Sequence, residues 1–427
     1  MAGTNPVPAP GVAVAASDDA PNYMVPLVVL TTLFFMWGLI TSLNDILIPH
    51  LKAIFTLNYV RVMLVQFCFF GAYLVMSFPS GFLVEHLGYR AGIVIGLSTA
   101  GVGCLMFYPA AGMASYGLFL AALFVLASGI TLLQVAANPY VTVLGPPRTA
   151  SSRLNLTQAF NSLGTTIGPF VGSMLILSGA AAATGAAEPS AAEQASTVQG
   201  PYLVLAAVLF IIAIAFSIFR LPDISGTHSV KGSDAHLPPV TSYRHLMLGA
   251  VGIFTYVGAE VSIGSFLVNF MSRPEIGGLT ESVAGRYLSL YWGGAMVGRF
   301  IGSVVLRKVK PGHVLAFNAT VVVLLLILAM ISGGRTAMWS VIAIGLFNSI
   351  MFPTIFALAV DGLGARTGEG SGILCMAIVG GAIIPLIQGF FADHIGLLVS
   401  FAIPAVCYLF IVYYGLAGYR AGRVGVA

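Results

Sequence analysis

Two carboxylic acids, Asp45 and Glu260, lie well inside long apolar segments of the sequence. An ionisable side chain in the middle of a lipid bilayer costs about 2.5–3.5 kcal/mol on insertion scales, so each one needs a physical reason. A carboxyl group in a dry cavity has a raised pKa, which lets it take up a proton on one side and release it on the other. Asp45 is therefore a candidate proton-coupling residue. The alternative is a structural acid that is hydrogen-bonded to a neighbouring helix.

Other polar residues share the helical faces of these two acids. Trp37, Thr41 and Asn44 precede Asp45 at spacings that place them on one side of a helix. Glu260 lies one helical turn after Tyr256, which carries a phenolic hydroxyl group. Its carboxylate can either bind sugar hydroxyl groups or hold its helix in a buried network, and the sequence leaves both interpretations open.

Neutral amides form a second pattern. Gln134 and Asn138 are four residues apart, and Asn155, Gln158 and Asn161 are spaced by three. Buried amides need hydrogen-bond partners, and both amides and sugar hydroxyls can donate and accept. We therefore expect sugar contacts here. The alternative is hydrogen bonding between helices, and Asn138 precedes a proline, where it can simply cap a broken turn.

Aromatic and polar residues elsewhere extend this set. A ring can stack on the apolar face of a pyranose, although aromatic residues in membrane helices more often pack or mark the interface. Arg299 lies inside another apolar segment, where it either reaches the membrane surface or forms a gate ion pair. The full set of expected substrate-binding residues is Asn44, Trp37, Gln134, Gln158, Asn161, Tyr256, Glu260, Trp292, Asn348 and Gln388.

The composition requires lipid as the solvent. Only 7% of the 427 residues are charged, whereas 58% are apolar, and the mean hydropathy is +0.98. A soluble chain carries about 25% charged residues, so an ordinary soluble enzyme and a disordered protein are both excluded. We expect an all-α membrane protein with twelve transmembrane helices, near 24–49, 60–84, 91–112, 115–141, 154–178, 201–220, 244–271, 281–306, 312–332, 337–360, 371–393 and 397–418.

The segments divide into two bundles of six. We expect a disordered N-terminal tail (1–22), a first bundle (23–220), a cytoplasmic linker (221–243), a second bundle (244–418) and a C-terminal tail (419–427). Residues 179–200 form an Ala-rich loop. Most basic residues fall in loops on one side if both termini are cytoplasmic, as the positive-inside rule requires: Arg90, Arg148, Arg153, Arg220, Lys231, Arg244, Arg307, Lys308, Lys310, Arg366, Arg420 and Arg423.

A repeat supports this division. Gly81, Glu85, Gly88 and Arg90 follow the second segment, and a glycine with a basic cluster that includes Arg307 follows the eighth. Parallel half-repeats of six helices build one large class of transporters.

With these features the sequence resembles the major facilitator superfamily, whose second loop has the pattern G-x-x-x-D-x-x-G-[RK], with Glu85 here in place of Asp. Four blocks are similar to the fucose–galactose–glucose:proton symporter family: FFMWGLITSLNDILIPHLK (34–52), LLQVAANPYVTVLGP (132–146), RLNLTQAFNSLGTTIGP (153–169) and YVGAEVSIGSFLVN (256–269). Gln134 departs from the fucose branch, which has Glu there, and matches the glucose/galactose and N-acetylglucosamine branches.

The resemblance implies a proton-coupled hexose symporter that works by alternating access. It implies that Asp45 is the protonation site, that Gln158 and Asn161 line the sugar site, and that the loop residues Glu85, Arg90 and Arg307 take part in gating. Arg299 is a further candidate gating residue from its place in the sequence alone. Sodium coupling and transport of fucose, mannose or N-acetylglucosamine remain alternatives. We expect a functional monomer in a bacterial inner membrane.

Motifs of other classes do not occur. The sequence has no Walker-type phosphate loop, no His-Glu-x-x-His and no Gly-x-Ser-x-Gly, which argues against ATP-driven transport and against an enzyme. We expect no metal site, no cofactor besides the coupling ion and no nucleic-acid partner. The four cysteines lie in apolar segments and are expected to be core residues.

Replacing Asp45 with Asn should abolish uphill sugar uptake and leave sugar binding or exchange partly intact, because the amide cannot carry a proton. Uptake against a gradient by this variant at the wild-type rate would remove Asp45 from the mechanism.

Overall fold

Backbone groups in lipid have no water to bond with, so a spanning segment must close its own hydrogen bonds as a helix. The computed structural model describes residues 23–55, 59–172, 198–218 and 238–422, with the backbone alone for 41–55, 59–66, 169–172, 281 and 282. In this described part the chain is helical, with short turns between the helices.

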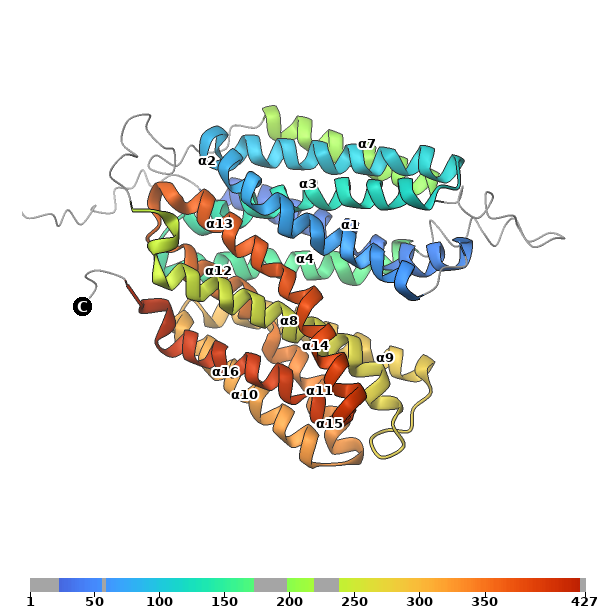
Figure 1. Cartoon of the computed structure of the whole chain (residues 1–427). Coiled ribbons are helices and arrows are strands. Elements are labelled where there is room, and N and C mark those ends of the chain that lie inside the picture. The colour runs from blue at the N-terminus through green and yellow to red at the C-terminus, as the bar shows by residue number, and fades with distance from the viewer. Residues whose placement is uncertain (1–22, 56–58, 173–197, 219–237, 423–427) are drawn as a thin grey trace, which may run out of the picture.

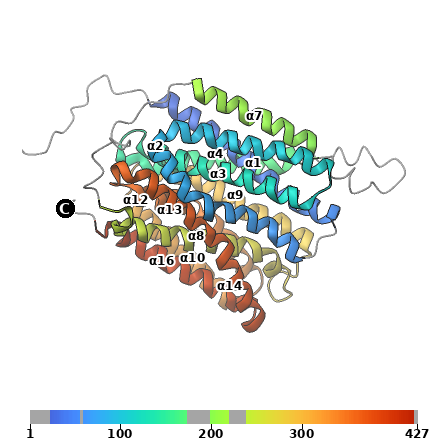
Figure 2. The ribbon, with the colours of Figure 1, turned by 45° about the horizontal axis from the view of Figure 1, so that its top comes forward.

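The first half of the described chain is one group of helices. It contains α1 (Met24–Phe55), α2 (Tyr59–Gly112), α3 (Tyr116–Val143), the 3₁₀ turn η1 (Pro147–Thr149), α4 (Ala150–Gly172) and α7 (Gln199–Ile218). The helix α3 packs along α2, α4 packs along α1, and α7 covers the outside of α2. Figures 1 and 2 show these helices together on one side of the molecule.

The second half forms the other group. It contains η4 (Val240–Ser242), α8 (Arg244–Ser272), α9 (Glu281–Val305), α10 (Pro311–Ile331), α11 (Gly334–Asn348), α12 (Met351–Val360), η5 (Gly364–Arg366), α13 (Thr367–Met376), η6 (Ala377–Val379), α14 (Gly380–Ile395), α15 (Leu397–Ser400), α16 (Ala402–Leu416) and η7 (Gly418–Arg420). The helix α13 extends from this half to pack on α2 and α3, and α4 packs on α9 (Figure 1).

In their described residues, the expected apolar segments coincide with helices, and several differ in continuity. The segments 60–84 and 91–112 lie in one helix, α2, which bends at Gly88, where φ is +83°. The segment 337–360 is interrupted at Ser349 and Ile350, and the segment 371–393 is interrupted at η6. In the described ranges, eight helices are long and apolar enough to cross a membrane.

The expected domain boundaries fall largely outside the described residues. The tail 1–22 is outside, as is most of the linker 221–243, of which only 238–243 is described, with η4 in it. The Ala-rich loop 179–200 is also mostly outside, and α7 begins within its last residues, at Gln199.

Glycines allow the helices within each half to touch backbone to backbone. A Cβ at Gly129 on α3 would lie 2.3 Å from the amide nitrogen of Ala100 on α2. In the second half, a Cβ at Gly345 would lie 2.0 Å from the carbonyl oxygen of Tyr291. The hydrophobic effect does not drive helix association in lipid. Small residues instead let the helices approach closely, so that van der Waals packing stabilises the crossing.

Gly129→Ala should lower the thermal unfolding midpoint of the purified protein, because the added methyl group forces α2 and α3 apart. Overpacking of this kind costs about 1–3 kcal/mol. Gly117→Ala on the same helix is the matched control, since a Cβ there meets nothing within 4 Å. A loss of stability in the control as large as that in Gly129→Ala would contradict this account.

Candidate functional site

The two halves are hydrogen-bonded to each other at one end of the molecule. The Ser371 hydroxyl on α13 donates to Val135 O on α3 at 2.9 Å. The Asn155 amide on α4 donates to Arg299 O on α9 at 2.8 Å, and the Ser152 hydroxyl donates to Ser303 O. We call this region, where α13 meets α2 and the start of α4 meets the end of α9, the seam.

A polar cavity of about 490 Å³ lies between the halves beside the seam. Binding sites for small molecules usually measure about 300–1,000 Å³. Its walls come from α4, α8 and α9, so both halves contribute. They combine hydroxyl groups, an amide, a carboxylate, a guanidinium group and an indole ring: Asn161, Ser162, Thr165, Thr166, Glu260, Ser289, Trp292, Gly293, Ala295 and Arg299.

A network of tyrosines holds the carboxylate of this cavity. The Tyr256 hydroxyl donates to Glu260 Oε1 at 2.7 Å and lies 3.0 Å from Asn348 O. The Asn348 amide donates to the Tyr291 hydroxyl at 2.9 Å and accepts from the Tyr408 hydroxyl at 2.8 Å. The Tyr and Asn side chains are buried, so they fix the position of Glu260 at the cavity wall.

The break between α11 and α12 supplies acceptors for Arg299. Its Nε donates to Ser349 O at 3.1 Å, and its Nη1 donates to the Ser162 hydroxyl across the two halves. Carbonyl groups at a helix break have lost their intrahelical partners and can accept from side chains. Arg299 is therefore bonded inside the bundle, at the cavity, and not directed to the membrane surface.

The amides of the first half occupy three different environments. The Asn161 amide lines the cavity and donates to Phe34 O at 2.9 Å. Gln158 is 3.4 Å from Asn138 Oδ1, and the Gln134 amide donates to the Tyr73 hydroxyl at 2.7 Å. Gln134 Oε1 and Asn138 Nδ2 are buried and have no partner among the described residues, so they have bonding capacity left.

Like Gln134 and Gln158, two further expected substrate contacts do not line the central cavity. Trp37 packs on Phe34, with ring centroids 5.3 Å apart, and faces an apolar pocket inside the first half. The Gln388 amide is buried and lies 3.4 Å from the Ser400 hydroxyl within the second half. The side chains of Asn44 and Asp45 are outside the described part, although their backbone belongs to α1.

The expected gating residues are also separated. Glu85 is buried where α2 meets α13. Arg90 binds Phe216 O and Ser217 O at the end of α7, so its hydrogen bonds stay within the first half. Arg307 is exposed and has no ion pair with another described residue.

Four polar residues of the cavity were not expected from the sequence: Ser162, Thr165, Thr166 and Ser289. The first three follow Gln158 and Asn161 on α4 at spacings of three and four residues. This periodic pattern of hydroxyl residues could have predicted that they share the same helical face. Ser289 carried no such signal, because it lies between Leu288 and Leu290 and no other hydroxyl or amide residue is one helical turn away on α9.

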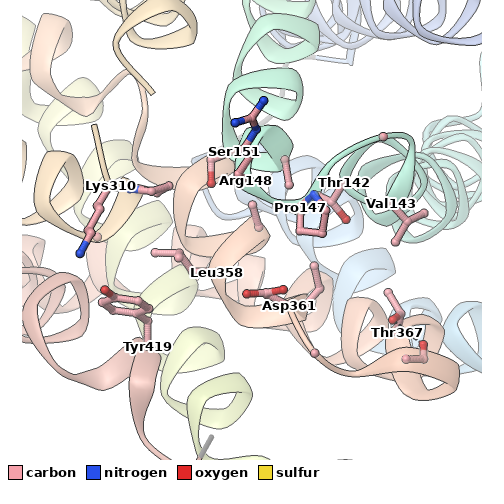
Figure 3. Close-up of a pocket in the computed structure, with 18 residues that line it drawn as sticks. Thr142, Val143, Pro147, Arg148, Ser151, Lys310, Leu358, Asp361, Thr367 and Tyr419 are labelled. Atoms are coloured by element: carbon pink, nitrogen blue, oxygen red, sulfur yellow. Dashed lines mark hydrogen bonds between the residues drawn. The ribbon is translucent and has the colours of Figure 1, made fainter. Parts of the chain in front are cut away.

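A second cavity of about 460 Å³ opens at the outer edge of the seam. Figure 3 shows Asp361, Leu358 and Thr367 from the second half opposite Thr142, Pro147 and Ser151 from the first. Arg148 and Lys310 also line it. This cavity brings water-accessible space to the beginning of α13. In the described ranges no group of three or more His, Cys, Asp or Glu residues could hold a metal ion, and the four cysteines are free thiols.

Comparisons with known proteins identify the family. The model of the Major Facilitator Superfamily matches residues 29–377. The chain belongs to this superfamily. It is 58% identical over 400 residues to the "Glucose/galactose transporter" of Brucella abortus (strain 2308), covering 94% of this chain and 95% of that one. It is 35% identical to the "L-fucose-proton symporter" of Escherichia coli (strain K12), over 91% of both chains.

The fold agrees with a solved member of the superfamily. The structure described as "FucP, in the outward conformation" has a TM-score of 0.85 and 32% identity, covering 92% of this chain and 98% of that chain. The comparisons confirm the family that the sequence resembles. The structure has the all-helical fold of the major facilitator superfamily.

Proposed function

We propose that this major facilitator protein is a symporter that couples the movement of protons to the uptake of glucose and galactose. The observation that carries the proposal is the central cavity, whose polar groups come from both halves. The 58% identity to a protein named glucose/galactose transporter supports the choice of substrate, and the more distant proton symporter supports the coupling ion.

The chemistry of the cavity suits an uncharged sugar. The carboxylate of Glu260 and the hydroxyls of Ser162, Thr165 and Ser289 offer many acceptors and donors to ring hydroxyl groups. Trp292 is 44% exposed and presents an indole ring on which a pyranose can stack. Buried polar groups that a sugar leaves unpaired cost binding energy, so this lining discriminates between hydroxyl patterns.

The membrane arrangement follows from the helices. We propose twelve transmembrane helices in two six-helix bundles, with α2 supplying two spans on either side of Gly88. The breaks in α11–α12, α13–α14 and α15–α16 then fall within or at the edge of single spans. Both termini are placed in the cytoplasm, in a bacterial inner membrane, which makes the seam cytoplasmic. The protein works as a monomeric transporter and not as an enzyme.

Transport then requires the seam to open. With the seam closed, the central cavity is cut off from the cytoplasm by the bonds of Asn155, Ser152 and Ser371. Rocking of one half against the other exposes the same cavity on the other side. Moving one elementary charge through 100 mV is worth about 2.3 kcal/mol, which can concentrate a neutral sugar roughly 50-fold. Asp45 is the proposed carrier of that proton.

Uptake by purified protein in sealed liposomes tests the function. In sodium-free buffer with an alkaline interior, labelled glucose and galactose should accumulate above their external concentration, and a protonophore should abolish the accumulation. Unlabelled fucose, mannose and N-acetylglucosamine should compete more weakly. Accumulation that depends on a sodium gradient and not on the pH difference would show that sodium is the coupling ion. Absence of uptake of every hexose would overturn the proposal.

Glu260→Gln should raise the sugar concentration for half-maximal exchange by about 10-fold or more. A hydrogen bond to a charged group contributes about 1.5–3 kcal/mol, and the amide keeps the size of the side chain without the charge. Glu275→Gln is the matched control, since Glu275 pairs with Arg273 on the surface, away from the cavity. Equal half-saturation in wild type and Glu260→Gln would exclude Glu260 as a sugar ligand.

A further inference from the structure

The cavity of about 460 Å³ at the outer edge of the seam is built from both halves of the protein. The first half contributes Thr142, Arg148 and Ser151, and the second half contributes Lys310 and Asp361 (Figure 3). The volume lies in the range of sites that bind small molecules. Because the walls belong to different halves, the cavity keeps this shape only while the halves are joined at the seam.

Three helices begin at this cavity. Its walls include the first residues of α4 (Ala150 and Ser151), of α10 (Pro311 and Gly312) and of α13 (Thr367). The first amide groups of a helix have no intrahelical acceptor, and the helix dipole adds a partial positive charge at this end. Three helix N-termini around one space therefore favour an anionic group.

Two cationic side chains add to this positive potential. Arg148 lies in the turn η1 before α4, and Lys310 directly precedes α10. Both side chains are exposed, and neither has an ion pair with a carboxylate in the described part of the chain. One cation belongs to each half, so an anionic ligand that pairs with both of them contacts both halves.

Ser151 provides an independent sign of a ligand. Its side chain is only 4% exposed and lines the cavity. The Ser151 hydroxyl has no hydrogen bond to any other described residue, whereas the hydroxyl of the next residue, Ser152, donates across the seam. Buried hydroxyl groups normally have a partner, so this one is available to a molecule in the cavity.

Asp361 makes the cavity a poor site for a simple anion. Its carboxylate repels negative charge, but it accepts hydrogen bonds from hydroxyl groups. The Thr142 and Thr367 hydroxyls donate to Pro139 O at 2.7 Å and to Gly364 O at 2.6 Å, so both can still accept. The lining therefore suits a ligand that carries one anionic group and several hydroxyl donors.

We propose that this cavity is a regulatory site for a phosphorylated hexose, which joins the two halves and stabilises the closed seam. The phosphate group binds the cations Arg148 and Lys310 and the helix N-termini, while the ring hydroxyls donate to Asp361 and bond with Ser151. A ligand that binds only the closed conformation shifts the equilibrium away from opening.

The regulatory role rests on the proposed transport function. The proposed membrane arrangement places this cavity on the cytoplasmic side. Phosphoryl transfer to an imported hexose produces the ligand there, so accumulated product slows the supply of its own precursor. The sugar in the central cavity and the ligand at the seam are then coupled through one conformational equilibrium.

Isothermal titration calorimetry of the purified protein with glucose 6-phosphate tests the site without transport. Glucose 6-phosphate should bind about tenfold more tightly than inorganic phosphate, which has no ring hydroxyls for Asp361 and Ser151. Lys310→Gln and Ser151→Ala should each raise its dissociation constant about fivefold. Asp361→Asn should instead strengthen the binding of inorganic phosphate, because a negative charge is removed from the cavity.

Lys308→Gln is the matched control, because it removes the same charge two positions from Lys310 and Lys308 does not line the cavity. Equal weakening in the Lys308 and Lys310 variants would overturn the proposal, since a general loss of positive charge would then explain the effect. Equal affinity for glucose 6-phosphate and inorganic phosphate would also overturn it.

Liposomes that enclose glucose 6-phosphate test the regulatory role. The enclosed ligand should lower the maximal rate of glucose uptake, and Lys310→Gln should remove this inhibition. Binding with no effect on uptake would reject the regulatory role. Binding by a protein that transports no hexose would reject only the proposed function, whereas hexose uptake by a protein that does not bind glucose 6-phosphate would reject only this site.

Discussion

The structure depends on one constraint: a polar group that is removed from water must be bonded within the protein. Helices meet this requirement for the backbone, and the described part of the chain is helical in its apolar segments. The break between α11 and α12 is the informative exception. Its carbonyl groups accept from Arg299 and lie next to Tyr256, so the interruption of a helix becomes part of the cavity wall. The same constraint gives the buried Glu260 its tyrosine partner.

The two halves contribute different chemistry to the cavity. The first half supplies neutral amide and hydroxyl groups on α4, while the second supplies a carboxylate, a guanidinium group and an indole. A sugar that binds both sets joins the halves at the cavity, whereas the hydrogen bonds of the seam join them at one end. Alternating access is therefore a competition between bonds that must break at the seam and contacts that the substrate retains throughout the movement.

Proton coupling by alternating access needs an acid that the two sides of the membrane reach in turn. At the seam, glycine contacts bring the backbones of α2 and α13 so close that no water fits between them. Asp45 belongs to α1, in the first half. Opening and closing of the seam changes which side of the membrane reaches the space between the halves, so a proton and a sugar bound there are linked through the same movement.

The sequence determined the membrane class, the helical segments and the polar face of α4, because composition and periodicity are local properties of the chain. It also pointed to Glu260 and Asn161, which the structure brings to one cavity. The sequence could not distinguish Glu260 and Asn161, which line the cavity, from Trp37 and Gln388, which do not. Trp37 packs within the first half, and Gln388 is bonded within the second. The face that a buried helix presents to a cavity depends on its neighbours. For the same reason, only the tertiary structure placed Gly368 of α13 against Glu85 of α2, since helix packing brings together residues from different halves of the chain.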